Sequence, residues 1–205
     1  MDNKQHWEKV FTTKQPHEVS WTQDVPKTSL DLILKTGVAK GDPIIDIGGG
    51  DSLLVDHLLG LGYTDVSVLD ISGEALKRAQ SRLGKYAAKV QWIESDIRDF
   101  LLSRTYAIWH DRAAFHFLTD PADIQLYATK VAKAVTHSII MGTFSEQGPE
   151  KCSGLVVCRY SETAMRKVFE GSFRLNECFT EDHTTPFNTI QNFRFGWFIK
   201  KELLP

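Results

Sequence analysis

The sequence predicts an α/β fold: a doubly wound, mostly parallel seven-stranded sheet with helices on both faces and an antiparallel C-terminal strand. Residues 43–61 read in order as an apolar strand, a glycine turn and a helix, which is the first unit of such a sheet. Short apolar runs then alternate with helical patterns along the chain, as parallel sheets require. Near the C-terminus, residues 190–199 alternate apolar and polar side chains, which indicates a half-buried strand.

The glycine turn lies where the chain leaves the first strand. Ile44, Ile45 and Ile47 form a short buried run, three glycines follow, and residues 52–61 have a helical pattern. A glycine carries no Cβ, so backbone at such a turn approaches a ligand closely. We therefore expect a ligand outside the carboxyl end of this strand, held partly by Gly48, Gly49 and Gly50.

An aromatic-bearing arm precedes this unit. Residues 1–26 are polar except for Trp7, Phe11 and Trp21, and the segment around Trp7 and Phe11 has the pattern of a short helix. These aromatic side chains need an apolar surface to pack on, which is either the domain itself or a ligand. A helix at residues 29–36, stopped by Gly37, joins the arm to the first strand.

The remaining elements follow from periodicity, caps and turn residues. Strands are predicted at residues 66–70, 90–94, 106–110 and 138–144, and helices at 74–83, 120–134 and 161–170. Two closing strands are predicted at 173–179 and 190–199, with a loop at 180–186 in which His183 is either a base or a solvated side chain. Residues 145–160 form a long irregular insertion, which we expect to border the site.

Composition narrows the class of protein. A chain of 205 residues with 42% hydrophobic residues is large and apolar enough for one domain spanning residues 1–205. A net charge of −2 does not favour a nucleic-acid partner. Three cysteines without metal-type spacing predict no metal site and a reduced, cytoplasmic setting. We expect no membrane partner, because no apolar run approaches about 20 residues. The N-terminal segment does not have the pattern of a signal peptide.

Acidic residues follow the first two strands. A dinucleotide fingerprint has a third glycine where this chain has Leu53, which disfavours a nicotinamide cofactor. Asp46, just before the glycines, repels a pyrophosphate and attracts an amine-bearing ligand. Asp70 lies twenty residues beyond Gly50, a spacing at which a carboxylate accepts from both ribose hydroxyls of an adenosine cofactor. The alternative is that Asp70 caps the next helix, a role for which Ser72 is the better candidate.

These features, from Trp7 to Lys200, resemble the class I S-adenosylmethionine-dependent methyltransferases, whose first motif is acidic-x-Gly-x-Gly. The resemblance implies a Rossmann-like fold and an S-adenosyl-L-methionine cofactor, with S-adenosyl-L-homocysteine as its product. It assigns the Asp96 carboxylate to the adenine amino group and the Ile97 backbone to the ring edge, although Asp96 is also a common turn residue. Ile71 would lie against the adenine, and the arm at 1–26, including Trp21, would cover the cofactor.

Four polar side chains gather after the fourth predicted strand. His110, Asp111, Arg112 and His116 follow the central strand at the edge where ligand and chemistry meet in a doubly wound sheet. We expect these residues to be the catalytic, acceptor-facing ones. The alternative is an ion pair between Asp111 and Arg112 that only shapes the loop, with His116 packed among aromatic side chains.

The predicted activity is transfer of a methyl group to a nucleophilic heteroatom of a small molecule by in-line displacement. No Asn-Pro-Pro-Tyr or Asp-Pro-Pro-Tyr segment follows the fourth strand, which disfavours amino methylation of adenine or glutamine. No cysteine lies there either, which disfavours attack on a pyrimidine ring. Two alternatives remain open. One is a protein lysine methyltransferase, and the other is a cofactor-binding protein without catalytic activity.

Overall fold

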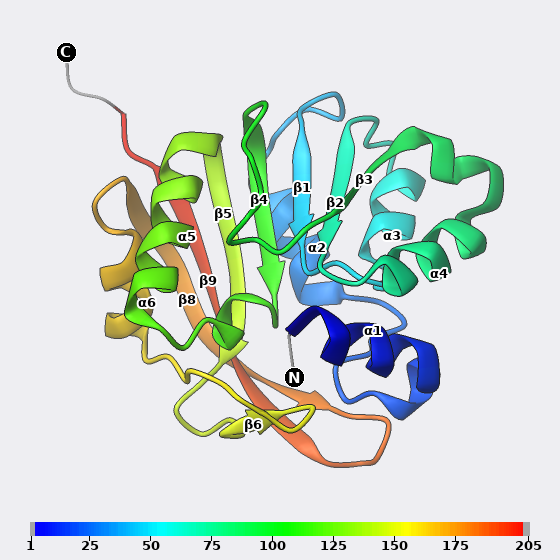
Figure 1. The fold of residues 1–205 in the computed structure, drawn as a ribbon. Helices are drawn as coiled ribbons and strands as arrows, with labels where there is room; N and C mark the ends of the chain where they lie inside the picture. Colours follow the sequence, from blue (N-terminus) through cyan, green and yellow to red (C-terminus); the bar gives the residue numbers. More distant parts are fainter. Residues whose placement is uncertain (1–2, 203–205) are drawn as a thin grey trace.

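The computed structural model describes residues 3–202 and has one central sheet of seven strands (Figure 1). The strand order is β3-β2-β1-β4-β5-β9-β8, with β9 antiparallel to both of its neighbours. The strands are β1 (Ile44–Ile47), β2 (Val66–Asp70), β3 (Val90–Glu94), β4 (Tyr106–Arg112), β5 (Val135–Phe144), β8 (Phe173–Thr184) and β9 (Ile190–Lys200). The predicted fold class is confirmed.

Helices surround this sheet. They are α1 (Asn3–Thr13), α2 (Lys27–Lys35), α3 (Leu54–Gly60), α4 (Gly73–Leu83), α5 (Pro121–Ala134) and α6 (Glu162–Phe169). Single 3₁₀ segments occur at Pro16–Glu18, Gly84–Lys89 and Phe115–Phe117. Side chains of α2, α3 and α4 pack with one face of the sheet, and those of α5 and α6 pack with the other. Among residues 3–202, no helix is both long and apolar enough to cross a membrane.

Alternation along the strands explains the two layers of core. On β1, Ile44 packs with the α2 and α3 side, whereas Ile45 and Ile47 pack with the α5 and α6 side. All four residues of β1 are buried, as expected for a central parallel strand covered by helices on both faces. Caps fix the helix starts: Ser72 Oγ accepts from Ala75 N at α4, and the Asp120 side chain accepts from Ala122 N at α5.

Several segments differ from the sequence prediction, and strand β5, for example, begins at Val135 and not at Ser138. Strand β4 continues through Arg112 instead of ending at His110, because Asp111 and Arg112 still pair with β5. The predicted loop at 180–186 is mostly strand, since β8 pairs with β9 up to Thr184. The insertion at 145–160 contains a two-stranded hairpin of β6 (Lys151–Cys152) and β7 (Leu155–Val156), apart from the main sheet.

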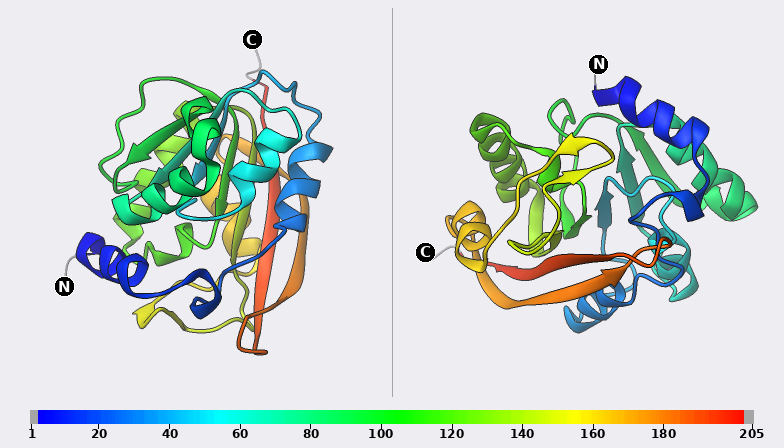
Figure 2. Two further views of the ribbon diagram at one scale, coloured as in Figure 1. Left: turned by 90° about the vertical axis from the view of Figure 1, so that its right-hand side faces the viewer. Right: turned by 90° about the horizontal axis from the view of Figure 1, so that it is seen from below.

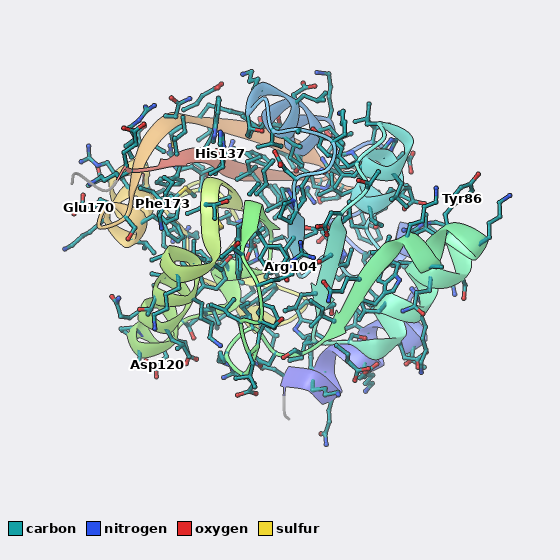
Figure 3. The ribbon with its side chains drawn as sticks, turned by 90° about the horizontal axis from the view of Figure 1, so that it is seen from above. Tyr86, Arg104, Asp120, His137, Glu170 and Phe173 are labelled. Carbon is teal, nitrogen blue, oxygen red and sulfur yellow. The ribbon has the colours of Figure 1, made fainter. Side chains whose placement is uncertain are left out.

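Three segments gather at the carboxyl edge of the parallel strands. The view from below shows α1, the β6–β7 hairpin and the far end of the β8–β9 hairpin around the ends of β1 and β4 (Figure 2). The opposite edge, where Arg104 and His137 lie, is seen from above in Figure 3. Strand order reverses between β1 and β4, so the carboxyl edge there is the expected place for a ligand.

Candidate functional site

Two adjoining cavities open at the carboxyl edge. The first lies over the ends of β1 to β4, beneath α1, and the second lies beside the glycine turn and α2. Four residues line both cavities: Phe11, Trp21, Gly48 and Arg112. We call this meeting point the junction. A ligand longer than either cavity would pass through it.

The glycine turn lies at the junction. Gly48 has φ of 63°, and a Cβ there would lie 2.4 Å from Ala114 Cβ. A Cβ at Gly49 would lie 2.6 Å from an oxygen of the Asp46 carboxylate. Both positions are therefore closed to larger residues. Gly50, with φ of 49°, lines the second cavity together with Gly49.

Asp46 and His110 form a buried pair on neighbouring strands. They are in register between β1 and β4, and His110 Nδ1 lies 2.6 Å from Asp46 Oδ1. Because a carboxylate only accepts, His110 donates from Nδ1. His110 Nε2 lies 2.8 Å from Ser29 Oγ on α2. The three side chains, two of them predicted, line the second cavity.

Asp70 ends β2 and lines the first cavity. Burial, with smaller contributions from the charges of Asp51 and Asp46, raises the pKa of Asp70 to about 7. One carboxylate oxygen accepts from the backbone N–H of Ser72 at 2.8 Å. A buried carboxylate with this pKa is stabilised by any ligand that donates hydrogen bonds to it.

Asp96, Ile97 and Ile71 also line the first cavity. Burial opposes ionisation of Asp96, but hydrogen bonds and the charge of Arg98 outweigh it and lower the pKa of Asp96. Arg98 Nη2 donates to Asp96 Oδ2 at 2.6 Å, and Arg98 Nε donates to Oδ1 at 3.0 Å. Arg98 therefore holds the carboxylate ionised at the cavity wall.

Arg112 is the last residue of β4 and lies at the junction. Its Nη1 donates to the Trp21 carbonyl at 2.9 Å, and its guanidinium lies 4.7 Å from the centre of the Phe193 ring. Its Nε is buried and has no hydrogen-bond partner among residues 3–202. Burial lowers the pKa of Arg112 to about 10, so the side chain stays cationic at neutral pH.

Asp111 and His116 line neither of the two cavities, contrary to the expectation that they face an acceptor. Asp111 is fully buried on the opposite face of β4, where it accepts from the Tyr127 hydroxyl at 2.7 Å and from the backbone N–H of Phe115 at 3.0 Å. His116 is fully buried against Phe144, and burial lowers its pKa to about 3. We assign both residues to holding the loop after β4. Successive side chains of a strand point to opposite faces of the sheet. Because β4 extends to Arg112, His110 and Asp111 therefore lie on opposite faces.

Aromatic side chains of the arm close the first cavity from outside. Trp7 and Trp21 are 5.8 Å apart between ring centres, and Trp7 lies 5.0 Å from Phe117. Trp7, Phe11 and Trp21 all line this cavity, so the aromatic residues both pack on the domain and face its site. An apolar wall of this kind excludes water from whatever the cavity holds.

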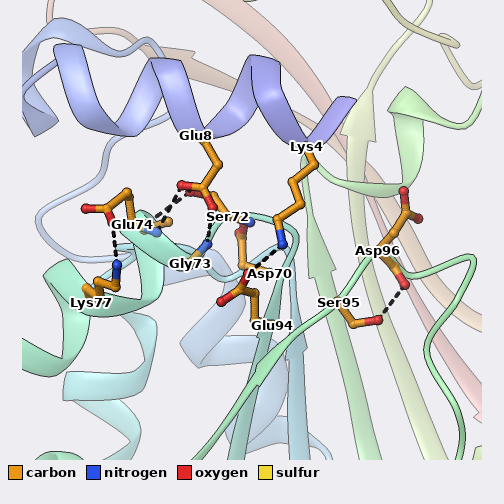
Figure 4. A network of polar contacts seen from close by, with 11 residues as sticks. Lys4, Glu8, Asp70, Ser72, Gly73, Glu74, Lys77, Glu94, Ser95 and Asp96 are labelled. Carbon is orange, nitrogen blue, oxygen red and sulfur yellow. Dashed lines mark hydrogen bonds and ion pairs between the residues drawn. The ribbon is translucent and has the colours of Figure 1, made fainter. Parts of the chain in front are cut away.

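Polar contacts fasten α1 to the ends of β2 and β3 (Figure 4). Glu8 Oε1 accepts from Gly73 N at 2.8 Å, and Glu8 Oε2 lies 3.0 Å from Ser72 Oγ. Burial raises the pKa of Glu8, but the backbone and hydroxyl donors of α4 outweigh it, and the net pKa is lowered. Lys4 Nζ pairs with Glu94 Oε1 at 2.6 Å.

A family model now identifies the domain. Residues 44–137 match the model described as a methyltransferase domain. This segment holds the glycine turn, Asp70, Asp96 and the end of β4. The matched segment and the strand order of the sheet are those of the class I, Rossmann-like methyltransferase fold.

Solved structures share the whole fold of this chain at low sequence identity. The N-methyltransferase NodS from Bradyrhizobium japonicum, in complex with S-adenosyl-L-homocysteine, is 17% identical with a TM-score of 0.74, over 98% of this chain and 100% of that one. The 1,6-didemethyltoxoflavin-N1-methyltransferase of Burkholderia thailandensis is 13% identical with a TM-score of 0.68, over 97% and 84%. An Anabaena variabilis methyltransferase is 13% identical with a TM-score of 0.76, over 98% and 96%. No curated protein matches the sequence.

Two residues that position the site, Ser29 and Glu8, are absent from the sequence prediction, and a third, His183, was expected to be a base or a solvated side chain. Ser29 bonds His110, Glu8 caps α4, and His183 Nε2 lies 2.7 Å from the Ser20 carbonyl next to Trp21. Each joins segments far apart in the chain, which no local motif reveals. For His183, the polar loop that suggested solvation is the paired strand β8, and its side chain is buried.

Proposed function

We propose that the protein is an S-adenosyl-L-methionine-dependent methyltransferase that methylates a nucleophilic heteroatom of a small molecule. One observation carries the proposal: the family-matched segment places the Asp70 and Asp96 carboxylates in one cavity that leads to the glycine turn at the junction. Relatives of the same fold were solved with S-adenosyl-L-homocysteine or S-adenosyl-L-methionine.

The cavity residues fit this cofactor. Asp70 would accept from the ribose hydroxyls, which gives its buried carboxylate the donors that favour its ionised form. Ile71 and Ile97 would flank the adenine, and Asp96 would accept from the adenine amino group. A Cβ at Gly50 would lie 3.1 Å from Asp70 Oδ2 and 3.3 Å from Phe11 Cζ. The glycine therefore leaves the space between Asp70 and Phe11 free.

With this cofactor bound, methyl transfer would require little chemistry from the side chains of the protein. The bound cofactor supplies an electrophilic methyl group on a sulfonium. The turn and β4 would fix the orientation of the acceptor relative to that methyl group, and the arm with Trp7 and Trp21 would exclude water. A base is required only for an acceptor that arrives protonated. His110, held by Asp46 and Ser29, lines the second cavity and would be the base in that case.

The charge at the junction supports a small-molecule acceptor over a protein lysine. Arg112 is a cation that lines both cavities. A lysine ammonium entering there would meet a like charge in a partly buried place, which is unfavourable. A neutral or anionic acceptor meets no such repulsion.

The test is isothermal titration with S-adenosyl-L-homocysteine, comparing the wild type with Asp70→Ala. Loss of a charge-assisted hydrogen-bond pair costs about 1.5–3 kcal/mol, so the variant should bind about tenfold or more weakly. The exposed Asp99→Ala variant is the matched control and should bind as the wild type does. Absence of binding by the wild type would contradict the proposed cofactor.

A further inference from the structure

Arg112 is a cation without a carboxylate partner. Within residues 3–202 its one hydrogen bond is to the Trp21 carbonyl, and no ion pair includes it. Its Nε is buried and has no hydrogen-bond partner among residues 3–202. Taking a charged group out of water costs free energy that is normally offset by an ion pair or hydrogen bonds. The guanidinium therefore lacks a partner that a ligand would supply.

The two carboxylates whose charges act on Arg112 form hydrogen bonds with other residues. Asp46 accepts from His110, and Glu181 accepts from the Thr28 hydroxyl. Both act on Arg112 only through their charge, which raises its pKa slightly against the larger effect of burial. The positive charge also acts on its surroundings: burial first, and the charge of Arg112 second, lower the pKa of His116.

The other arginines of the two cavities do have partners. Arg98 pairs with Asp96 at 2.6 Å in the first cavity, and Arg82 pairs with Asp56 at 2.8 Å in the second. Of the described arginines that line either cavity, Arg112 alone has no ion pair. The junction thus has one uncompensated positive charge, which matches a singly charged carboxylate better than a doubly charged phosphate.

The topology places this charge on the acceptor side. The carboxylates assigned to the adenosine, Asp70 and Asp96, follow β2 and β3, on one side of β1. Arg112 ends β4 on the other side of β1, and its guanidinium lies over Phe193 of β9. Around it the first cavity is largely apolar, with Phe117 and Leu118 in its wall.

We propose that the acceptor is a small molecule with an apolar body and a carboxylate group, and that Arg112 binds this carboxylate. The inference rests on the proposed methyltransferase function and adds the substrate class. The planar guanidinium offers parallel N–H donors that match a carboxylate in a two-point contact. In the absence of such a ligand, the Trp21 carbonyl is a weaker, neutral substitute.

The experiment uses benzoate as the probe and benzamide as its neutral counterpart. Both are titrated into the wild-type protein saturated with S-adenosyl-L-homocysteine, whose own binding is measured first. Benzoate should bind at least about tenfold more tightly than benzamide, the difference expected for a charge-assisted hydrogen-bond pair. Equal affinities, or no binding of benzoate, would overturn the inference. If S-adenosyl-L-homocysteine does not bind to the wild-type protein, that result would instead contradict the proposed function.

Variants assign the effect to Arg112. Arg112→Gln should abolish the preference for benzoate while it keeps the affinity for S-adenosyl-L-homocysteine. Arg112→Lys, which keeps the charge and loses the two-point contact, should reduce the preference several-fold and gives a reading if the Gln variant does not fold. Arg104→Gln, on the opposite edge of the sheet (Figure 3), is the matched control and should behave as the wild type.

A second outcome would contradict the inference in a different way. Arg112 could belong to the carboxylate of the cofactor itself. In that case Arg112→Gln would weaken S-adenosyl-L-homocysteine by tenfold or more and leave 5′-methylthioadenosine, which lacks the amino-acid group, unaffected. That pair of results would reassign the residue.

Discussion

His110 donates from Nδ1 to the Asp46 carboxylate across 2.6 Å, joining β4 to β1 where the strand order reverses. Both side chains are buried, and the far nitrogen of the imidazole is bonded to Ser29 of α2. One imidazole therefore connects two central strands and a helix directly beside the glycine turn. Its orientation is fixed from both sides.

Breaking this connection should lower stability. Asp46→Asn removes a charge-assisted hydrogen bond and should cost about 1.5–3 kcal/mol in the free energy of unfolding. Ser29→Ala leaves a buried His110 nitrogen without its partner and should cost about 1–3 kcal/mol. Urea denaturation measures both. The exposed Ser103→Ala variant is the control, and a Ser29→Ala variant as stable as this control would contradict the assigned network.

The raised pKa of Asp70 predicts pH-dependent binding of the cofactor product. The pKa is about 7 in the free protein because the carboxylate is buried. If ribose hydroxyls donate to the ionised form, binding below pH 7 requires loss of a proton. S-adenosyl-L-homocysteine should therefore bind about tenfold more weakly at pH 6 than at pH 8. Isothermal titration at the two pH values checks this.

The Asp70 carboxyl group also makes the stability of the free protein depend on pH. Its pKa is about 4 in the unfolded chain and about 7 in the folded one, so between these values the folded state binds more protons. The contribution of Asp70 to stability should fall as pH rises from about 4 to 7. Asp70→Asn should remove both this slope and the pH dependence of binding. A variant that keeps either dependence would assign it to another group.

Glu8 is expected to hold α1 closed over the first cavity. Glu8→Gln weakens the cap on α4, an interaction of about 1 kcal/mol in helix caps, and should open α1 about fivefold more often. Hydrogen exchange of residues 3–13 measures that opening. Because the pKa of Glu8 is lowered in the folded protein, the cap should be present above about pH 4.5 and lost as pH falls through the folded pKa.

The exposed Glu146→Gln variant is the control for this lid prediction. Exchange in α1 should be unchanged in that variant. Equal exchange in Glu8→Gln and the control would show that the aromatic contacts of Trp7 and Phe11 hold the arm without the cap.

The sequence was most informative where local patterns decide the structure. Strands β2 and β3 have the predicted bounds, and Ser72 and Asp120 cap the helices as expected. The glycine turn also follows from local chemistry, because only glycine fits at Gly48. Such features depend on neighbouring residues and on sterics, which the sequence shows directly.

The sequence prediction was wrong where pairing with a strand far along the chain determines the local structure. Pairing with β5 extends β4 through Arg112, and this extension separates Asp111 from the cavities. Pairing with β9 turns a polar segment into strand and buries His183. The partners of His110 and of α4, Ser29 and Glu8, belong to segments without any motif. Long-range contacts of this kind leave no periodic signal.

Asp111 and Tyr127 form a second buried connection, and it yields the last prediction. The Tyr127 hydroxyl donates to Asp111 Oδ2 at 2.7 Å and accepts from Trp109 Nε1 at 2.8 Å. Tyr127→Phe removes both bonds, and it should cost about 1–3 kcal/mol in the free energy of unfolding. The exposed Tyr86→Phe variant (Figure 3) is the matched control and should be neutral.

The cost of Tyr127→Phe should depend on pH with a sign set by Asp111. Burial raises the pKa of Asp111 to about 6, while the Tyr127 hydroxyl opposes that rise by stabilising the ionised form. Stability should therefore fall as pH rises from about 4 to 6 in the wild type, and the fall should continue to higher pH in the variant. Thermal unfolding at pH 5 and pH 8 should show the larger loss at pH 8. An equal loss at both values would mean that Tyr127 acts on Trp109 and not on the ionisation of Asp111.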